Sequence, residues 1–298
     1  MGGKTVPQIW THSRIKCRMN CPMLEHLRYE EELTPIRRQD ALMIGSAVHK
    51  GIETWSIEEA MKEFDSFQIT CQEDADELEI AKATVAGMLT GYMCRFEPFE
   101  DHRPELEFSM PLILPTGRAS KKYIVAGKID DIEITKDGDW IVEYKTAGQL
   151  NGAYFERLYV DEQITMYCYA ARRLGFNPIG VKYRVIRKPT IRPRKGESMH
   201  QYLDRLTQDY LDRPEFYFYE QKLYRSQDDL EAFGKLLLRR ITEFDRAKKL
   251  GMNWMNTGHC SVYAGCRYLP LCTKQNGAEA LFERKAAHEE LGGNDTWD

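Results

Sequence analysis

The stretch AGKIDDIEITKDGDWIVEYKTA, residues 126–147, decides how the chain is expected to fold. Its β-branched and aromatic residues stand on both sides of the turn sequence KDGD, an order typical of a β-hairpin. The two strands are apolar enough to be buried, yet they carry Asp130, Asp131, Glu143 and Lys145. Charged side chains are seldom fully buried unless they are paired, so these four need an explanation.

The spacing of these charges suggests one. Residues two apart in a strand share a face, so Glu143 and Lys145 project together, while Val142 and Tyr144 point to the opposite face. Asp130 lies on the partner strand, which allows one carboxylate from each strand and a lysine to converge. Mg²⁺ prefers such oxygen ligands and keeps waters for a substrate phosphate. The alternative is an exposed hairpin that carries these charges by chance.

Length and composition set the frame for this hairpin. The chain has 298 residues, of which 42% are hydrophobic and 30% charged, enough for a sizeable core. No run approaches the roughly 18 apolar residues of a membrane helix, and the N-terminus lacks the apolar part of a secretory signal. We therefore expect a soluble cytoplasmic protein. Because the net charge is −4, any nucleic-acid site must be a local basic patch.

The remaining patterns predict helices, then a sheet with a crossover helix, then helices, in one integrated α/β domain. The expected parts are an N-terminal helical segment, a core and a C-terminal helical and cysteine-bearing segment, at 1–100, 101–200 and 201–298. Helices are expected at 13–33, 41–62, 73–95, 159–176, 199–212 and 228–250. Strands are expected at 105–113, 122–134, 140–146, 179–186 and 216–224.

Further polar residues flank the hairpin in the sequence. His49 lies on a predicted helix in GSAVHKGIE, four residues after Gly45. Gln163 and Tyr167 are one helical turn apart on the predicted helix after the hairpin, so they share a face. Taken singly, His49 is more typical of a packed histidine, and Gln163 and Tyr167 are more typical of an ordinary helix face.

Together with the hairpin, these residues form a pattern that resembles the PD-(D/E)XK nuclease superfamily in its RecB-like branch. That branch includes the nuclease domains of RecBCD and AddAB, the CRISPR adaptation nucleases and many phage exonucleases. Four motifs match in the family order: G-x-x-x-H at 45–49, G-[RK]-I-D at 127–130, the E-x-K element in VEYK at 142–145, and Q-x-x-x-Y at 163–167.

The resemblance implies a restriction-endonuclease-like core, a central mixed β-sheet flanked by helices, and cleavage of DNA that depends on Mg²⁺ or Mn²⁺. The catalytic residues that it implies are Asp130, Glu143, Lys145, Gln163 and Tyr167. The metal ligands that it implies are His49, Asp130, Glu143 and the backbone carbonyl of Tyr144. Gln163 and Tyr167 would support the lysine or the DNA strand.

Two nearby acids are less well defined. Asp131 follows the motif aspartate and lies on the opposite strand face, so we do not expect it to bind the metal. Glu107, in PELEFSM, is either an extra acidic group at the edge of the site or a solvent-facing strand residue. The sequence does not decide between these two interpretations.

Three of the eight cysteines form a C-x5-C-x5-C pattern near the C-terminus, at Cys260, Cys266 and Cys272. Structural zinc is usually held by tight C-x2-C pairs, which disfavours an ordinary zinc ribbon. The N-terminal segment SRIKCRMNCP resembles the family's S-x-L-x6-C-P element and places Cys21 in its cysteine position. In iron–sulfur members of the branch, one N-terminal and three C-terminal cysteines hold a [4Fe–4S] cluster. The resemblance thus implies Cys21, Cys260, Cys266 and Cys272 as cluster ligands.

This cysteine pattern departs from the family in one respect. The usual C-terminal spacing is C-x2-C-x5-C, and the first gap is wider here. The type of cluster is therefore open, and Cys17, one turn from Cys21, is a substitute ligand. Bound Zn²⁺ and three unliganded buried cysteines are the alternatives, while Cys71, Cys94 and Cys168 are expected to be structural.

A basic loop follows the predicted strand at 179–186. The sequence RVIRKPTIRPRKGES, at 184–198, holds six basic residues and one acid. Such a loop can follow phosphates and give salt-dependent affinity without reading bases. Its candidates for DNA contact are Arg187, Lys188, Arg192, Arg194 and Lys195. The alternative is a solvated loop.

Taken together, the sequence predicts a DNA exonuclease that acts at single-stranded ends in recombination, repair or phage DNA processing, in a bacterial or phage-infected cell. A structure-specific or nicking endonuclease is the first alternative. A non-catalytic nucleic-acid-binding module on a nuclease fold is the second. No G-x-x-x-x-G-K-[ST] motif is present, so unwinding would need a helicase or recombination partner.

Overall fold

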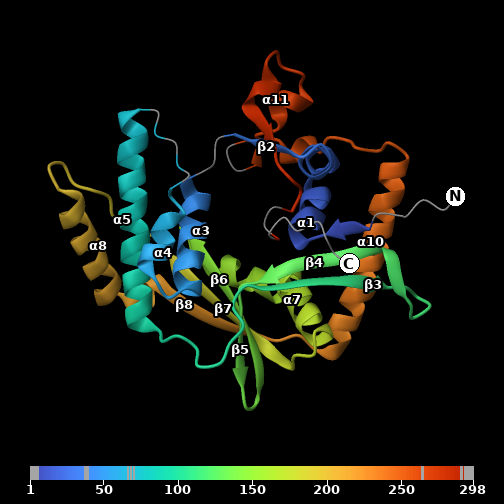
Figure 1. Cartoon of the computed structure of the whole chain (residues 1–298), viewed down its shortest axis with the longest axis horizontal. Helices are drawn as coiled ribbons and strands as arrows, with labels where there is room; N and C mark the ends of the chain where they lie inside the picture. Colours follow the sequence, from blue (N-terminus) through green and yellow to red (C-terminus); the bar gives the residue numbers. More distant parts are fainter. Residues whose placement is uncertain are drawn as a thin grey trace. The chain divides into compact units, whose positions relative to one another are not determined.

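The computed structural model in Figure 1 describes residues 7–36, 40–65, 67, 69, 71–262, 265–288 and 291. Its contacts divide the chain into two compact units that interleave along the sequence. The terminal unit comprises Met1–Arg37, Glu107–Lys128 and Ser226–Asp298, and the central unit comprises Arg38–Leu106 and Ile129–Arg225. These boundaries cut across the three expected segments, and the single integrated domain stays a prediction.

A four-stranded mixed sheet forms the middle of the central unit. Its strands are β5 (Asp131–Thr135), β6 (Gly138–Ala147), β7 (Pro178–Arg187) and β8 (Phe218–Leu223), in the order β5-β6-β7-β8. The pairs β5–β6 and β7–β8 are antiparallel, and β6–β7 is parallel. A parallel pair needs a crossover, which here contains α6 (Gly152–Glu156), a 3-10 turn (Arg157–Val160) and α7 (Glu162–Arg173). The predicted mixed sheet with flanking helices is confirmed.

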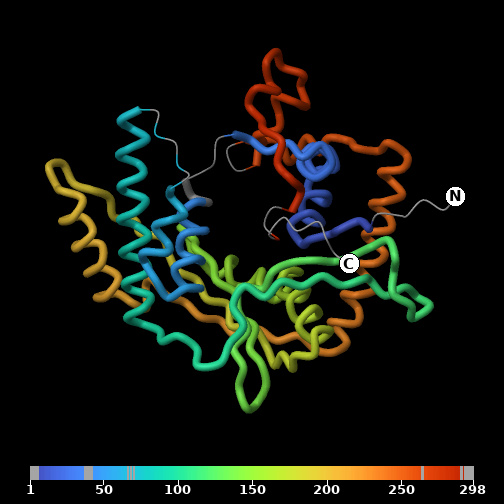
Figure 2. Tube along the Cα trace, viewed as in Figure 1, coloured from blue at the N-terminus to red at the C-terminus, as the bar shows by residue number. Residues whose placement is uncertain are grey.

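Helices cover one face of this sheet. They are α3 (Asp40–Glu53), α4 (Ile57–Lys62), α5 (Gln72–Arg95) and α8 (Met199–Asp212). Val142 and Tyr144 on β6 belong to the same buried cluster as residues of α3, α5 and α8. Helices α5 and α8 run side by side (Figures 1 and 2), and Gly91 allows their approach, because a Cβ there would lie 2.7 Å from the Cβ of Tyr210. The Tyr144 face of β6 is thus the core face.

The terminal unit joins the two ends of the chain. Its sheet has the order β1-β4-β3, formed by β1 (Gln8–Trp10), β4 (Ala119–Ile129) and β3 (Leu106–Ile113). A second, two-stranded sheet pairs β2 (Leu33–Pro35) with β9 (Phe282–Arg284). The helices are α1 (His12–Asn20), α2 (Pro22–Glu25), a π-helix (His26–Glu30), α10 (Gln227–Lys249) and α11 (Leu269–Cys272).

Several expected elements differ in the structure. The helix expected at 13–33 is interrupted at Cys21, which is extended, and α2 restarts at Pro22, a residue suited to the first turn of a helix. The strand expected at 216–224 begins with a helical turn, α9 (Pro214–Tyr217). The strand expected at 122–134 is two strands, β4 and β5, which belong to different sheets. Asp130 occupies the break between them.

No helix within the described ranges combines the length and the apolar character that a bilayer crossing requires.

Candidate active site

Asp130 is held beside strand β6 by contacts with its side chain. The backbone N–H of Tyr144 donates to Asp130 Oδ2 at 2.9 Å. The Nδ1 atom of His49, on α3, lies 3.7 Å from the same oxygen. The break between β4 and β5 therefore places the Asp130 carboxylate next to β6, with His49 at its side.

Glu143 is a buried carboxylate with an incomplete set of partners. Its side chain is 1% exposed, and its Oε1 accepts a short hydrogen bond from Lys145 Nζ. Its Oε2 is buried, and no donor among the described residues reaches it. Burial raises the pKa of Glu143 above its ordinary value, the charge of Asp130 raises it further, and Lys145 opposes the rise. This arrangement favours a cation at the open oxygen.

Lys145 is the counterpart of this carboxylate. Burial alone would lower its pKa, but the charges of Glu143 and Asp130 and the hydrogen bond to Glu143 outweigh burial and raise the pKa above its ordinary value. Lys145 is therefore an ammonium at neutral pH and acts as a hydrogen-bond donor and a positive charge. Lys145 lies on the same face of β6 as Glu143, as the two-residue repeat of a strand predicted.

Helix α7 adds Gln163 and Tyr167 to this site. Gln163 Nε2 donates to the Tyr167 hydroxyl at 2.9 Å, so the two share a helix face as expected. Asp161 caps the N-terminus of this helix, and its side chain accepts from the backbone N–H of Gln163 at 2.8 Å. Burial raises the pKa of Tyr167 well above its ordinary value, and the charges of Glu143 and Asp130 add to the rise. Tyr167 therefore lies close to the hairpin carboxylates.

Tyrosines that the sequence did not single out lie beside the same carboxylate. Tyr183 on β7 is the register partner of Glu143, so both side chains lie on one face of the sheet. Its hydroxyl is 3.4 Å from that of Tyr154 on α6, and the Arg157 guanidinium lies over the Tyr154 ring at 4.5 Å. The closeness of Tyr183 to Glu143 follows from the parallel register of β6 and β7, and the sequence alone does not give that register.

The sequence patterns also did not indicate Glu105, a further acid near Asp130. Glu105 donates its backbone N–H to the Asp130 carbonyl at 2.9 Å, and its charge contributes to the raised pKa of Tyr167. Glu107, the acid that the sequence pointed to, is exposed on β3 in the terminal unit. Its part in the site stays a prediction. Asp131 is buried on β5 and bonds to His102 Nδ1 at 2.9 Å.

The donor set at this site fits a hard divalent cation. Carboxylate oxygens of Asp130 and Glu143 would supply the charge, Glu143 Oε2 has no donor among the described residues, and the imidazole of His49 lies beside Asp130. As the side chains stand, no three His, Cys, Asp or Glu residues within the described ranges are close enough to hold a metal ion. Binding would thus need small side-chain movements, such as release of Glu143 Oε1 by Lys145.

The cysteines expected to act together gather in the terminal unit. The backbone N–H of Asn256 donates to Cys21 Sγ at 3.3 Å, and Cys260 Sγ lies 3.7 Å from the carbonyl oxygen of the same asparagine. Burial raises the pKa of Cys272, and the charges of Cys266, Cys21 and Cys260 add to the rise. All eight cysteines of the chain are free thiols. Four thiolates are the ligands that an iron–sulfur cluster requires, but as the side chains stand no three of these cysteines within the described ranges are close enough to hold a metal ion, so the cluster stays a prediction.

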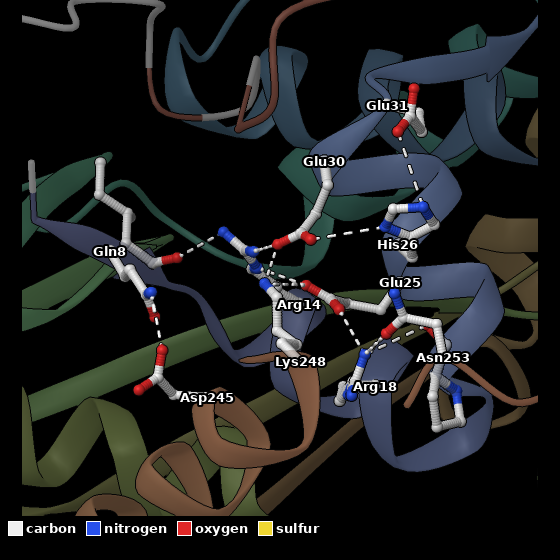
Figure 3. Close-up of polar contacts among 12 residues, drawn as sticks. Gln8, Arg14, Arg18, Glu25, His26, Glu30, Glu31, Asp245, Lys248 and Asn253 are labelled. Carbon is white, nitrogen blue, oxygen red and sulfur yellow. Dashed lines mark hydrogen bonds and ion pairs between the residues drawn. The ribbon is translucent and has the colours of Figure 1, made fainter. Parts of the chain in front are cut away.

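Figure 3 shows a buried ionic network that connects the segment carrying Cys17 and Cys21 to the end of α10 and the loop after it. Glu25 is 0% exposed and accepts from Arg14 Nε at 2.8 Å and from Arg18 Nη1 at 3.2 Å. Arg18 also donates to Asn253 Oδ1 at 2.7 Å and to the Met252 carbonyl at 3.2 Å. Through Arg18, which lies between Cys17 and Cys21, the network connects the loop after α10 to α1.

Only some of the basic side chains proposed for DNA contact are exposed to solvent. Arg187 lies over the Phe216 ring at 4.1 Å and donates to the Tyr219 hydroxyl at 3.1 Å. Lys188 is partly buried, and burial lowers its pKa. The exposed candidates are Arg192, Arg194 and Lys195. Contact between this loop and DNA stays a prediction.

The chain was also compared with known protein families, sequences and solved structures. A model of the PD-(D/E)XK nuclease superfamily matches residues 9–273. Among solved structures, the chain is similar to a protein from Eubacterium rectale described as a "putative exonuclease", with a TM-score of 0.49 and 11% identity. The similarity covers 81% of each chain. No curated protein sequence matches this chain significantly.

Proposed function

We propose that this chain, which belongs to the PD-(D/E)XK nuclease superfamily, is a divalent-metal-dependent DNA exonuclease. Nucleases of this superfamily typically use divalent metals, and the proposed ions are Mg²⁺ and Mn²⁺. The observation that carries the proposal is Glu143, a fully buried carboxylate whose Oε2 has no donor in the described part of the chain. A structural acid in such a place would be expected to have its hydrogen bonds complete.

The proposed ligands of the metal are Asp130, Glu143, His49 and the backbone carbonyl of Tyr144. A bound cation would stabilise the negative charge that develops on a phosphodiester and ease ionisation of the attacking water. Lys145 Nζ donates a hydrogen bond, either to that water or to a phosphate oxygen as charge builds on it. Gln163 and Tyr167 fix the position of the lysine or of the DNA strand.

Exonuclease action at single-stranded ends is proposed from the resemblance to cluster-bearing members of the branch, which often degrade such ends. Recombination, repair or phage DNA processing is the proposed setting, with unwinding supplied by a helicase partner. Arg192, Arg194 and Lys195 are proposed to contact phosphates of the strand, because their side chains are exposed on one loop after β7.

An iron–sulfur cluster is proposed as the second cofactor. The proposed ligands are Cys21, Cys260, Cys266 and Cys272, and the contacts of Asn256 with Cys21 and Cys260 support their common location. Anaerobically purified protein is expected to be brown and to contain iron and sulfide. One equivalent of zinc without iron would refute the cluster.

The cleavage proposal is tested with DNA labelled at one end. Linear single- and double-stranded DNA is incubated with the anaerobically purified protein and Mn²⁺, and the product ladder is read. An exonuclease leaves closed circular DNA intact, whereas a nicking endonuclease opens it. Lys145→Ala is expected to abolish cleavage and to retain folding and DNA binding, and unchanged cleavage by this variant would contradict the mechanism. Absence of cleavage by the wild type with either metal would favour a non-catalytic binding module.

A further inference from the structure

A row of aromatic side chains leads from the candidate active site to β8, the last strand of the central sheet. It begins at Tyr154 on α6, whose hydroxyl lies 3.4 Å from that of Tyr183, the register partner of Glu143. The ring of Phe155 follows, 5.2 Å from the Tyr154 ring between centroids, and Tyr219 on β8 lies 5.6 Å further. These three rings, the aromatic row, are partly exposed, so the row lies at the surface of the central unit.

An arginine lies at each end of the aromatic row. The Arg157 guanidinium stands over the Tyr154 ring, 4.5 Å from its centroid. At the other end, Arg187 donates to the Tyr219 hydroxyl at 3.1 Å, and its guanidinium lies 4.1 Å from the centroid of the Phe216 ring. Contact with a ring holds each guanidinium in place, so less side-chain freedom is lost when an anion binds to it.

Neither of these arginines has a carboxylate partner within the described part of the chain. Arg157 is exposed and makes no hydrogen bond or ion pair with any described residue. Arg187 is half-buried, and no acceptor among the described residues reaches its buried Nε. By contrast, Arg213 lies over the same Phe216 ring but forms an ion pair with Asp209. Because buried charges are ordinarily paired, the two arginines of the row offer their charge to an external anion.

The composition of this surface fits a single strand of DNA. Guanidinium groups bind backbone phosphates, and partly exposed rings contact unpaired bases and sugars on proteins that hold single strands. A duplex keeps its bases stacked inside and would leave the rings without these contacts. At the roughly 3.4 Å rise per nucleotide of a stacked strand, the ring spacings of 5.2 and 5.6 Å have room for about three nucleotides.

We propose that Arg157, the aromatic row and Arg187 bind the single strand of DNA that leads to the candidate active site. This inference rests on the proposed function and names the surface that the DNA strand follows. No sequence pattern indicated Arg157 or Phe155, because they join this surface only through the packing of α6 on β8. The surface binds the strand and takes no part in bond cleavage, so its substitution should raise KM and leave kcat unchanged.

Binding is tested with the full-length protein in EDTA, where metal-dependent cleavage is absent. Fluorescence anisotropy gives the Kd of a short labelled oligo(dT) and of a blunt duplex of the same length, each at several salt concentrations. We expect the single strand to bind at least about tenfold more tightly than the duplex, because only unpaired bases can contact the rings. Cleavage of the same oligonucleotide with Mn²⁺ is measured separately.

Variants locate this binding. Arg157→Gln and Arg187→Gln each remove one charge, so each should weaken binding of oligo(dT) and reduce the slope of log K against log salt by about 0.7, the value for one phosphate of a single strand. Phe155→Leu removes a ring and should weaken binding by about tenfold at an unchanged slope. Arg118→Gln, at an exposed arginine of the terminal unit without an ion pair among the described residues, is the matched control and should bind as the wild type does.

The outcomes separate this inference from the proposed function. If the wild type binds oligo(dT) with the expected dependence on Arg157 and Phe155 but cleaves no DNA, the surface is assigned and the nuclease proposal fails. If Arg157→Gln, Arg187→Gln and Phe155→Leu all keep the affinity and salt slope of the wild type, the inference is wrong even where DNA is cleaved. Equal affinity for single strand and duplex, or no binding of oligo(dT) by the wild type, would also overturn it.

Discussion

Glu143 in the central unit and Glu25 in the terminal unit are both buried glutamates, at 1% and 0% exposure, but their surroundings are opposite. Glu25 accepts from two arginines, Arg14 and Arg18, and its oxygens are satisfied. Glu143 has a lysine on one oxygen, no donor within the described chain on the other, and a second carboxylate, Asp130, nearby.

The difference separates two uses of a buried charge. A buried carboxylate with its partners complete resists removal, because loss of the acid leaves buried cations without a counter-charge. A buried carboxylate with an open oxygen and a like charge beside it is costly to the fold and persists where it serves binding. We therefore interpret Glu25 as structural and Glu143 as functional.

The largest effect is expected at the functional glutamate. Glu143→Gln removes the charge that would hold the cation, and we expect the rate of DNA cleavage to fall by at least about 10³-fold. We expect the melting temperature in EDTA to stay about the same, because the raised pKa of Glu143, about 8, keeps most of the metal-free acid protonated at neutral pH, and Gln is a neutral group of the same shape. Cleavage of end-labelled DNA and thermal melting measure the two effects. A variant that cleaves at the wild-type rate would contradict this assignment.

The structural glutamate is expected to behave in the opposite way. Glu25→Gln should lower the free energy of unfolding by about 3–5 kcal/mol, because Arg14 and Arg18 stay buried without a counter-charge. Cleavage per folded molecule should be nearly unchanged. Glu31→Gln, at an acid whose side chain is 44% exposed, is the control and should have little effect. Equal stability of the Glu25 and Glu31 variants would remove the structural half of the comparison.

The pH dependence of stability extends the comparison to Asp245. Burial would raise the pKa of Asp245, but hydrogen bonds from Lys122, Gln8, Lys249 and Tyr123 outweigh burial and hold the pKa well below its ordinary value. The stabilisation is therefore present above the unfolded pKa of about 3.9 and is lost as pH falls through the lower folded value. Asp245→Asn should lower the free energy of unfolding at neutral pH by about 1–3 kcal/mol and by less in acid.

Glu143 should show the opposite sign in the same measurement. Its folded pKa is raised, so the folded state without metal binds its proton more tightly than the unfolded state does. Its contribution to stability therefore decreases as pH rises above the unfolded value of about 4.3. Urea unfolding in EDTA between acid and neutral pH, on Asp245→Asn and Glu143→Gln, separates the two signs. A difference of the same sign for both variants would contradict the assignment.

The smallest effect is expected on the exposed basic loop. Arg194→Ala and Lys195→Ala should each weaken binding of single-stranded DNA and reduce the slope of log K against log salt by about 0.7. The catalytic rate at saturating DNA should not change. Lys82→Ala, on the exposed face of α5, is a control of the same charge. A salt slope that equals the wild type in both loop variants would place the DNA elsewhere.

Local spacing explains which parts of the site the sequence could predict. Glu143 and Lys145 share a face because strands repeat every two residues, and Gln163 and Tyr167 do so because helices place residues four apart side by side. Tyr183 depends on the register of a parallel strand pair, which many distant residues decide together. Glu105 depends on a backbone pairing with Asp130 that no local pattern encodes.

The same limit applied to the fold. The mixed sheet and its crossover were predictable because apolar strands alternate with helical periods. The break at Asp130 was not, because an unbroken apolar run reads as one strand even where its two halves join different sheets. The complete partner set of Glu25 was also hidden, because Lys248 and Asn253 reach this region from the other end of the chain.

The most direct test of the functional assignment is a calorimetric titration of the protein with Mn²⁺ near neutral pH, in buffers that differ in their enthalpy of ionisation. We expect Mn²⁺ to bind to the wild type and to the folded fraction of Glu25→Gln with release of protons, because the cation must displace the proton that the raised pKa of Glu143 favours. Glu143→Gln should bind Mn²⁺ far more weakly and without that proton release. Equal Mn²⁺ affinity in the wild type and Glu143→Gln would contradict the central claim.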